Sequence, residues 1–254
     1  MKPIILLTAS SVIFLLAQFS AFAASTSVHT TWLWHMHQPN YWPDRRNFGT
    51  DHYEAAWDTI QQQNAGRVHP SPEILSQIFS VADRVAAYQG RPRDAVGTVL
   101  GYPNAGAQMS FSGALIENIQ SLGANNQLGY GGSWNSGNQQ ARGWTTSGGK
   151  PRLDLVNFTY HHALAPLISD ETLEMELRIH KRQMELFWGT SPAVSRGYFP
   201  AETCFTERMI PILKKVGIDW SVVANNHLTR SCADFRSCSA AAARIATFRI
   251  PPTS

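Results

Sequence analysis

Two histidines, His35 and His37, follow an apolar run near the start of the sequence. Side chains alternate along an extended chain, so both imidazoles point to the same side. Two imidazoles on one face can bind a metal or donate hydrogen bonds to hydroxyl groups, although a histidine at a strand end is often only structural. The surrounding aromatic residues favour a sugar site, while core packing is the expected role of at least two of the four: Trp32, Trp34, Tyr41 and Trp42.

A carboxylate, Glu202, is the second candidate for chemistry, because it lies among the apolar residues of the segment 199–203 (FPAET). Desolvation raises the pKa of such a carboxyl group unless hydrogen-bond donors stabilise its charge. A carboxylate in this setting can serve as a nucleophile or as an acid. Glu117 and Glu174, by contrast, are predicted to lie on helix surfaces.

Segments that favour β-strands come directly before these candidate residues. They are rich in β-branched and aromatic residues and end at polar ones. The predicted strands are 30–36, before the first histidines; 153–160, before His161 and His162; 197–201, before Glu202; and 218–224.

Helical patterns separate the predicted strands. Ser169 is an expected N-cap and Gly189 an expected stop for a helix over 170–188. A helix opened by Ser71-Pro72-Glu73 is predicted to continue through Val85, and Pro211 is expected to kink the segment 207–216 or to begin a second helical piece in it. The segment 101–149 holds 11 of the 18 glycines, which predicts a long loop region with one helix around 112–122.

This alternation of strands and helices predicts an α/β fold with a parallel sheet or barrel, whose ligand site lies at the carboxyl ends of the strands. A length of 254 residues fits one domain of this type. The net charge of +3 comes from 21 basic and 18 acidic residues, too balanced and dispersed for nucleic-acid binding. A charged fraction of 15% with 11% aromatic residues suits a neutral ligand on which rings can stack.

Residues 1–23 have the pattern of a secretory signal peptide, with Lys2 before an apolar run and small residues around an expected cleavage before Ala24. We therefore expect residues 24–254 to be periplasmic or secreted and not membrane-bound after cleavage. Among three cysteines, Cys232 and Cys238 are close enough to form a disulfide or can both stay unpaired, and Cys204 is expected to be a buried free thiol. The sequence contains no CxxC or HExxH zinc motif.

Three stretches resemble successive motifs of glycoside hydrolase family 57, in order and in spacing. They are His35-Met36-His37-Gln38-Pro39, residues 158–167 (FTYHHALAPL) and residues 197–211 (GYFPAETCFTERMIP). The resemblance covers roughly Thr30 to Asp234.

This resemblance implies a retaining glycoside hydrolase or transglycosylase that acts on α-glucans, on an incomplete (β/α)7-type barrel, without a metal or other cofactor. It implies that Glu202 is the catalytic nucleophile and that His35, His37 and His162 bind the sugar. Together with Trp42, taken from the aromatic cluster, these histidines are the predicted substrate-binding residues. The implied partner is an α-glucan or oligosaccharide, and the oligomeric state is left open.

A retaining mechanism needs a second carboxyl group about 5–5.5 Å from the nucleophile. The family's acid/base is an aspartate in a later motif, which the sequence up to Ser254 lacks, so we assign no acid/base. The segment 235–254 is rich in Ala and Arg and is atypical, which suggests a changed reading frame or a truncated C-terminus. Two alternatives remain: a non-catalytic carbohydrate-binding remnant, and a metal-dependent polysaccharide deacetylase in which His35, His37 and His162 supply nitrogen ligands.

Overall fold

A computed structural model describes residues 30–42, 53–67, 69, 71–224, 226–227, 230 and, as backbone only, 245–249. The predicted signal peptide, Cys232, Cys238 and most of the 235–254 tail lie outside the described residues. The description below concerns the compact unit that begins at Thr31. No helix among the described residues is long and apolar enough to cross a membrane.

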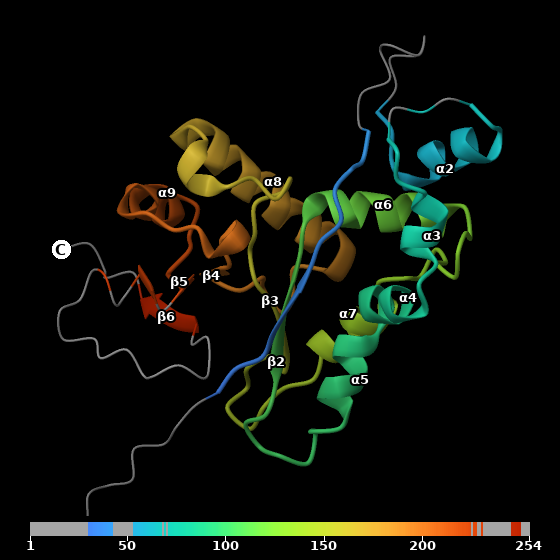
Figure 1. Cartoon of the computed structure of the whole chain (residues 1–254). Helices are drawn as coiled ribbons and strands as arrows, with labels where there is room; N and C mark the ends of the chain where they lie inside the picture. Colours follow the sequence, from blue (N-terminus) through green and yellow to red (C-terminus); the bar gives the residue numbers. More distant parts are fainter. Residues whose placement is uncertain are drawn as a thin grey trace, which may run out of the picture. The chain divides into compact units, whose positions relative to one another are not determined.

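Parallel strands form the centre of this unit, in two three-stranded sheets of order β1-β2-β3 and β4-β5-β6 (Figure 1). The strands are β1 (Leu33–Met36), β2 (Ala107–Phe111), β3 (Leu153–Leu155), β4 (Gly197–Tyr198), β5 (Trp220–Ala224) and β6 (Ile245–Arg249). A parallel bridge between Asn157 and Tyr198 connects the end of the first sheet to the start of the second. The first five strands are therefore parallel neighbours in chain order, as strand–helix alternation predicts.

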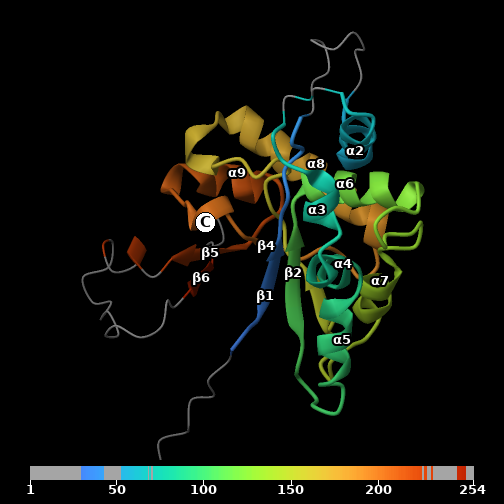
Figure 2. The same cartoon turned by 45° about the vertical axis from the view of Figure 1, so that its right-hand side comes forward.

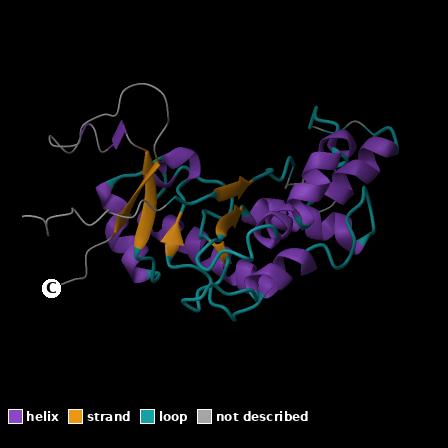
Figure 3. Ribbon diagram, turned by 90° about the horizontal axis from the view of Figure 1, so that it is seen from below, coloured by secondary structure: helices purple, strands orange, loops and turns teal. Residues whose placement is uncertain are grey.

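Helices separate consecutive strands. They are α2 (Ala56–Asn64), α3 (Leu75–Phe79), α4 (Ala82–Gln89), α5 (Arg91–Gly97), α6 (Gly113–Ala124), α7 (Ser136–Arg142), α8 (Asp170–Trp188) and α9 (Ile210–Lys215), with short 3-10 turns η3 (Ala165–Leu167), η4 (Ala201–Thr203) and η5 (Glu207–Met209). Figure 2 shows β1 and β2 side by side, with α4, α5 and α7 on one side of them. From below, the strands lie between groups of helices (Figure 3).

The expected capping signals determine the ends of the long helix α8. The Ser169 hydroxyl accepts a hydrogen bond from the backbone N–H of Thr172, and Gly189 ends the helix with φ +83°. Pro211 lies in the first turn of α9, directly after η5, so it begins a second helical piece as the sequence predicts.

Two predictions about secondary structure are wrong in part. The helix predicted from Ser71 through Val85 is two helices, α3 and α4, because the chain breaks at Ser80 and Val81 is 46% exposed. The glycine-rich segment 101–149 contains a strand, β2, and a second helix, α7, besides the predicted helix. Residues 245–249 form β6, which runs antiparallel to β5.

Two apolar clusters pack on the strands. The larger one contains Met109, Phe111 and Trp188 and is extended by the partly buried Trp34 and Tyr41, which therefore have the expected core-packing role. The smaller cluster contains Leu173, Leu177 and Tyr198 and joins α8 to β4. Through these two clusters, α8 packs against the strands beneath their carboxyl ends.

A glycine in β4 leaves room for a tryptophan ring on the neighbouring strand. A Cβ atom on Gly197 would lie 2.0 Å from the Trp220 ring on β5. We expect Gly197→Ala to lower the free energy of unfolding by about 1–3 kcal/mol, because the ring and both strands must shift. Chemical denaturation measures this, with Gly132→Ala as the control, since its added Cβ meets nothing within 4 Å. Equal stability of the two variants would contradict the packing described.

Candidate active site

The three histidines predicted from the sequence lie together at the carboxyl ends of the parallel strands. His35 is in β1 and His37 follows it, while His162 lies in a turn after β3 with φ +61°. The ring centroids of His37 and His162 are 4.0 Å apart, and the His35 ring is 5.6 Å from His162. The strands β1 and β3 therefore bring together imidazoles that are more than 120 residues apart in the sequence.

Two phenylalanines support this cluster. The Phe158 ring centroid is 4.4 Å from His35 and 5.1 Å from His162, and Phe158 is fully buried. The Phe199 ring, after β4, is 5.0 Å from His35 and stacks on Phe158 at 5.9 Å. This aromatic floor removes one side of the histidine cluster from water.

Burial keeps His35 and His37 neutral. Desolvation, with smaller contributions from His162, His37 and His180, lowers the pKa of His35 to about 3. Neither of its buried ring nitrogens has a hydrogen-bond partner in the described part of the chain. Burial, followed by the proximity of His162, lowers the pKa of His37 to about 4, and its Nδ1 lies 2.8 Å from the Ser112 hydroxyl at the N-cap of α6. Both rings are thus neutral groups suited to hydrogen bonding with an uncharged ligand.

Glu202 follows β4 in the short turn η4, and the structure places its carboxylate beside the histidine cluster. Its Oε1 is 3.6 Å from Nε2 of His162. Glu202 and Thr203 both have left-handed backbone conformations, with φ +53° and +54°, which costs free energy in residues other than glycine. Strain of this kind is frequent at functional sites, where it presents a side chain that an ordinary strand end would not.

The expected desolvation of Glu202 is wrong for this structure. The side chain is 70% exposed, because the left-handed turn directs it away from the apolar residues that precede it in the sequence. The carboxylate is therefore accessible to an incoming ligand, and only a bound ligand would bury it.

A residue on α8, Glu176, holds the turn that carries His162. The buried Glu176 carboxylate accepts hydrogen bonds from the backbone N–H of His161 at 2.8 Å and from its Nδ1 at 2.6 Å. The hydrogen bond with Glu176 raises the pKa of His161 against the opposing effect of burial. Burial favours a raised pKa for Glu176, but the His161 hydrogen bonds outweigh it and the pKa is lowered.

A fully buried histidine on α8, His180, connects the strand ends beneath the site. Its Nε2 donates to the Phe111 carbonyl at 2.6 Å, and its Nδ1 accepts from the Phe158 N–H at 3.2 Å. A carbonyl can only accept and an N–H can only donate, so these partners select one neutral tautomer. Burial lowers the pKa of His180 to about 4, although the bond to Phe111 opposes this.

Trp42, the fifth predicted site residue, does not join the cluster. Its ring packs edge-on against His69 with 6.4 Å between centroids, and the described ring contacts of the cluster do not include it. Trp42 is predicted as a site residue because it belongs to an aromatic-rich stretch, and such a composition does not specify which ring faces a ligand.

Sequence reasoning missed Glu117, which was predicted on a helix surface. Its carboxylate accepts hydrogen bonds from Asn40, Tyr53 and Tyr160 and is half-buried at the site's edge. Glu174 does lie on the surface, paired with Arg178 and Lys215. A single acidic residue in a helical pattern gives no signal that separates these two environments.

Metal binding and the state of the Cys204 thiol are the remaining chemical questions for the described residues. No group of three His, Cys, Asp or Glu residues in the described ranges has a geometry suited to a metal ion. Cys204 is half-buried rather than buried as expected, and its thiol is free.

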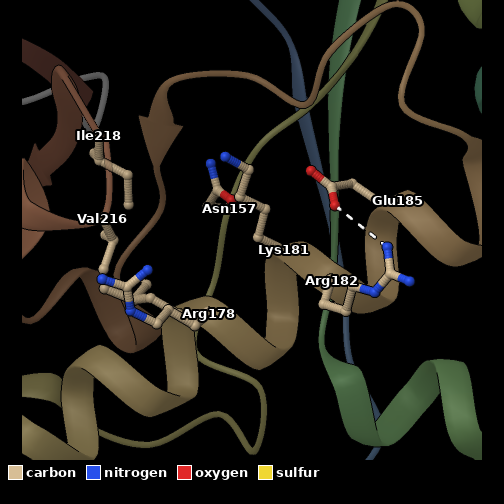
Figure 4. Close-up of a pocket in the computed structure, with 8 residues that line it drawn as sticks. Asn157, Arg178, Lys181, Arg182, Glu185, Val216 and Ile218 are labelled. Carbon is tan, nitrogen blue, oxygen red and sulfur yellow. Dashed lines mark ion pairs between the residues drawn. The ribbon is translucent and has the colours of Figure 1, made fainter.

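A separate open pocket of about 260 Å³ lies along α8 (Figure 4). Its polar lining includes Arg178, Lys181, Arg182 and Glu185, with Arg182 and Glu185 3.9 Å apart. None of the five predicted site residues lines it. Its basic side chains are exposed, as on an ordinary solvated helix face.

The buried neutral histidines predict acid sensitivity. A histidine whose pKa is lowered by folding binds protons preferentially in the unfolded state, so stability is lost as the pH falls below about 6.5 towards the folded values. At pH 5.5 the free energy of unfolding is therefore lower than at pH 7.5 by about 1.4 kcal/mol for each of His35 and His180. His161 has the opposite effect, since its pKa is raised.

Urea denaturation between pH 7.5 and 5 measures this loss. The variant His35→Gln should show a shallower decline in the free energy of unfolding than the wild type. The same slope in both proteins would show that His35 is not held neutral by the fold.

Comparison with known proteins identifies the family of this chain. The chain belongs to glycosyl hydrolase family 57, because the model of that family matches residues 31–244. An alpha-amylase from Niallia circulans is 31% identical over 239 residues, covering 83% of this chain and 18% of the relative. The chain thus spans about a fifth of the length of that relative.

Solved structures show weaker similarity. A 4-alpha-glucanotransferase from Thermococcus litoralis has a TM-score of 0.47 at 14% identity, with 78% of this chain and 23% of that chain covered. A family 4 carbohydrate esterase from Streptomyces lividans has a TM-score of 0.32 at 13% identity, over 57% of this chain and 64% of the other.

Proposed function

We propose that the described site is the nucleophile side of a retaining glycoside hydrolase or transglycosylase that acts on α-glucans. The carrying observation is the exposed Glu202 carboxylate, 3.6 Å from His162 at the carboxyl ends of the parallel strands. Family membership and the amylase name of a relative support the substrate class. The parallel strands then belong to an incomplete (β/α)7-type barrel.

The chemistry proposed for Glu202 is nucleophilic displacement. One carboxylate oxygen attacks the anomeric carbon, the bond from that carbon to the glycosidic oxygen breaks, and an acid protonates the departing oxygen. Water or a sugar hydroxyl, which gives its proton to the conjugate base of the same acid, then attacks that carbon and releases the carboxylate, which gives hydrolysis or transfer. We assign no acid/base residue within the 254 residues.

His35, His37 and His162 are proposed to bind the sugar. The lowered pKa values of His35 and His37 keep these rings uncharged. His37 Nδ1 already lies 2.8 Å from the Ser112 hydroxyl, so its Nε2 is the nitrogen proposed to contact a sugar hydroxyl. His162 lies directly beside the carboxylate and is placed to contact the sugar ring that Glu202 attacks. Trp42, outside the cluster, is at most an outer contact of a longer glucan.

A mechanism-based label tests the proposal. In 5-fluoroglucosyl fluoride the bond between C1 and fluorine breaks as the carboxylate forms an ester with C1, and fluoride leaves without protonation. The label therefore reports the nucleophile even where the acid/base is absent. We expect mass spectrometry of the digested protein to place the label on Glu202. A label on another carboxylate would overturn the assignment.

Two alternatives give different outcomes. Binding of maltoheptaose without any label would favour a carbohydrate-binding protein without catalysis. Stoichiometric zinc in the purified protein would favour a metal-dependent deacetylase.

We also propose export, on the basis of the signal-peptide pattern in residues 1–23. A periplasmic or secreted location follows, with Ala24 as the first residue of the mature chain. N-terminal sequencing of protein from the native host tests this, and a chain that still begins at Met1 would contradict it.

A further inference from the structure

Glu117 is the acceptor of a small hydrogen-bond network at the edge of the site. Its Oε2 accepts from Asn40 Nδ2 at 2.7 Å and from the Tyr53 hydroxyl at 2.5 Å, and its Oε1 accepts from the Tyr160 hydroxyl. Asn40 also donates to the Tyr53 oxygen. All three partners are neutral donors, so the carboxylate is bound without a counter-charge among them.

Two of these partners, Asn40 and Tyr160, come from the two segments that carry the site's histidines. Asn40 lies three residues after His37, and Tyr160 lies two residues before His162. One carboxylate on α6 is thus hydrogen-bonded to both segments, while the two imidazoles they carry are 4.0 Å apart between centroids.

Tyr160 contacts α6 at three points, which gives this connection a defined geometry. Its hydroxyl donates to Glu117, and its backbone carbonyl accepts from the N–H of Ala114 at 3.2 Å. Its ring lies over Gly113, where a Cβ would be 2.2 Å from Cδ2 of Tyr160. Tyr160 is only 4% exposed, so the side chain has no freedom to compensate for a lost bond.

The first turn of the same helix contacts His37. The Ser112 hydroxyl caps α6 by accepting from the Leu115 N–H, and it lies 2.8 Å from Nδ1 of His37. Helix α6 therefore holds His37 through Ser112, and holds the segments on both sides of the imidazole pair through Glu117.

We infer that Glu117 is a positioning residue that sets the separation of His37 and His162 by joining Asn40 to Tyr160. This inference rests on the proposed function, since the two imidazoles are proposed to bind the sugar. Glu117 itself acts through these segments and is assigned no contact with the glucan.

The test combines maltoheptaose binding with the histidine ring signals in NMR spectra. The variant Glu117→Gln keeps the side-chain shape but loses the charge and one acceptor oxygen. We expect about tenfold weaker binding of maltoheptaose by calorimetry, equivalent to about 1.4 kcal/mol. The ring signals of His37 and His162 should shift while those of His180 stay unchanged, because His180 is held by Phe111 and Phe158. A purely structural role would lower the melting temperature without this selective shift.

Tyr160→Phe removes a single hydroxyl from the network and gives the same test if Glu117→Gln does not fold. The effects of the two substitutions on affinity should not add in the double variant, because both break one connection. Glu174→Gln is the control, since Glu174 pairs with Arg178 and Lys215 on the surface of α8. Its affinity and histidine signals should match the wild type.

The possible failures are distinguishable. Folded Glu117→Gln and Tyr160→Phe variants with control-like affinity and unchanged His37 and His162 signals would overturn the positioning role. A wild-type protein that does not bind maltoheptaose would overturn the proposed sugar site, and the histidine signals of the variants would still decide whether Glu117 positions the imidazoles.

Discussion

Glu202→Gln is expected to lower the rate of α-glucan turnover by about 10⁴-fold in full-length protein from the native source. The amide has the same shape as the carboxylate but cannot attack the anomeric carbon. The Glu202 side chain is 70% exposed, so its substitution removes no core contact and should change the free energy of unfolding by less than about 0.5 kcal/mol. Turnover assays with soluble starch and a denaturation curve measure the two effects.

Glu207→Gln is the matched control, because Glu207 is exposed and lies only five residues further along the chain. We expect it to retain wild-type turnover. Azide separates the role of a nucleophile from that of an acid: in Glu202→Ala, azide can attack C1 from the vacated side and yield the β-glycosyl azide. Turnover unchanged by Glu202→Gln would remove Glu202 from the mechanism, and an azide product of α configuration would assign it the role of acid.

The sequence predicts those parts of the fold whose signals are local. The ends of α8 follow from Ser169 and Gly189, since a side-chain cap and a left-handed glycine act within a few residues. The start of α9 likewise follows from Pro211. In these places the sequence pattern and the tertiary structure favour the same conformation.

The missed elements depend on distant contacts. Strand β2 lies between β1 and β3, and its five residues, AQMSF, follow a stretch rich in glycine and turn residues. Its pairing with β1 and β3 stabilises an extended conformation that its own composition does not predict. The break between α3 and α4 has a similar origin, because Leu75 and Phe79 are the residues buried against the rest of the unit, whereas Ile74 and Val81 are about half exposed.

The residues of the candidate site likewise divide into those that have a local sequence signal and those that do not. His35, His37, His162 and Glu202 were predicted from motifs, and the structure gathers them at the ends of three strands. Glu117 has no such local signal, since its role arises from the hydrogen bonds that α6 makes with distant segments. Trp42 shows the converse: it lies in an aromatic-rich stretch near the histidines in the sequence, but its described ring contact is with His69.

Phe158→Ala is expected to lower the free energy of unfolding by about 3–5 kcal/mol, because it empties a fully buried aromatic position. Denaturation at pH 7.5 measures this loss. The same cavity should admit water beside His35, whose ring centroid is 4.4 Å from that of Phe158. The pKa of His35 should then rise from about 3 towards its ordinary value, which NMR titration of the ring signals detects.

Phe111→Ala distinguishes this local effect from a general loss of stability. Phe111 is equally buried, but its ring packs on Trp188, with 5.0 Å between centroids, and His180 contacts only its backbone carbonyl. We therefore expect a similar loss of stability with the pKa of His35 still near 3. If both variants raised that pKa alike, the low value would reflect the stability of the whole unit, and Phe158 would have no special part in keeping the imidazole neutral. If only Phe158→Ala raises it, the aromatic floor both stabilises the fold and maintains an uncharged ring at the proposed sugar site.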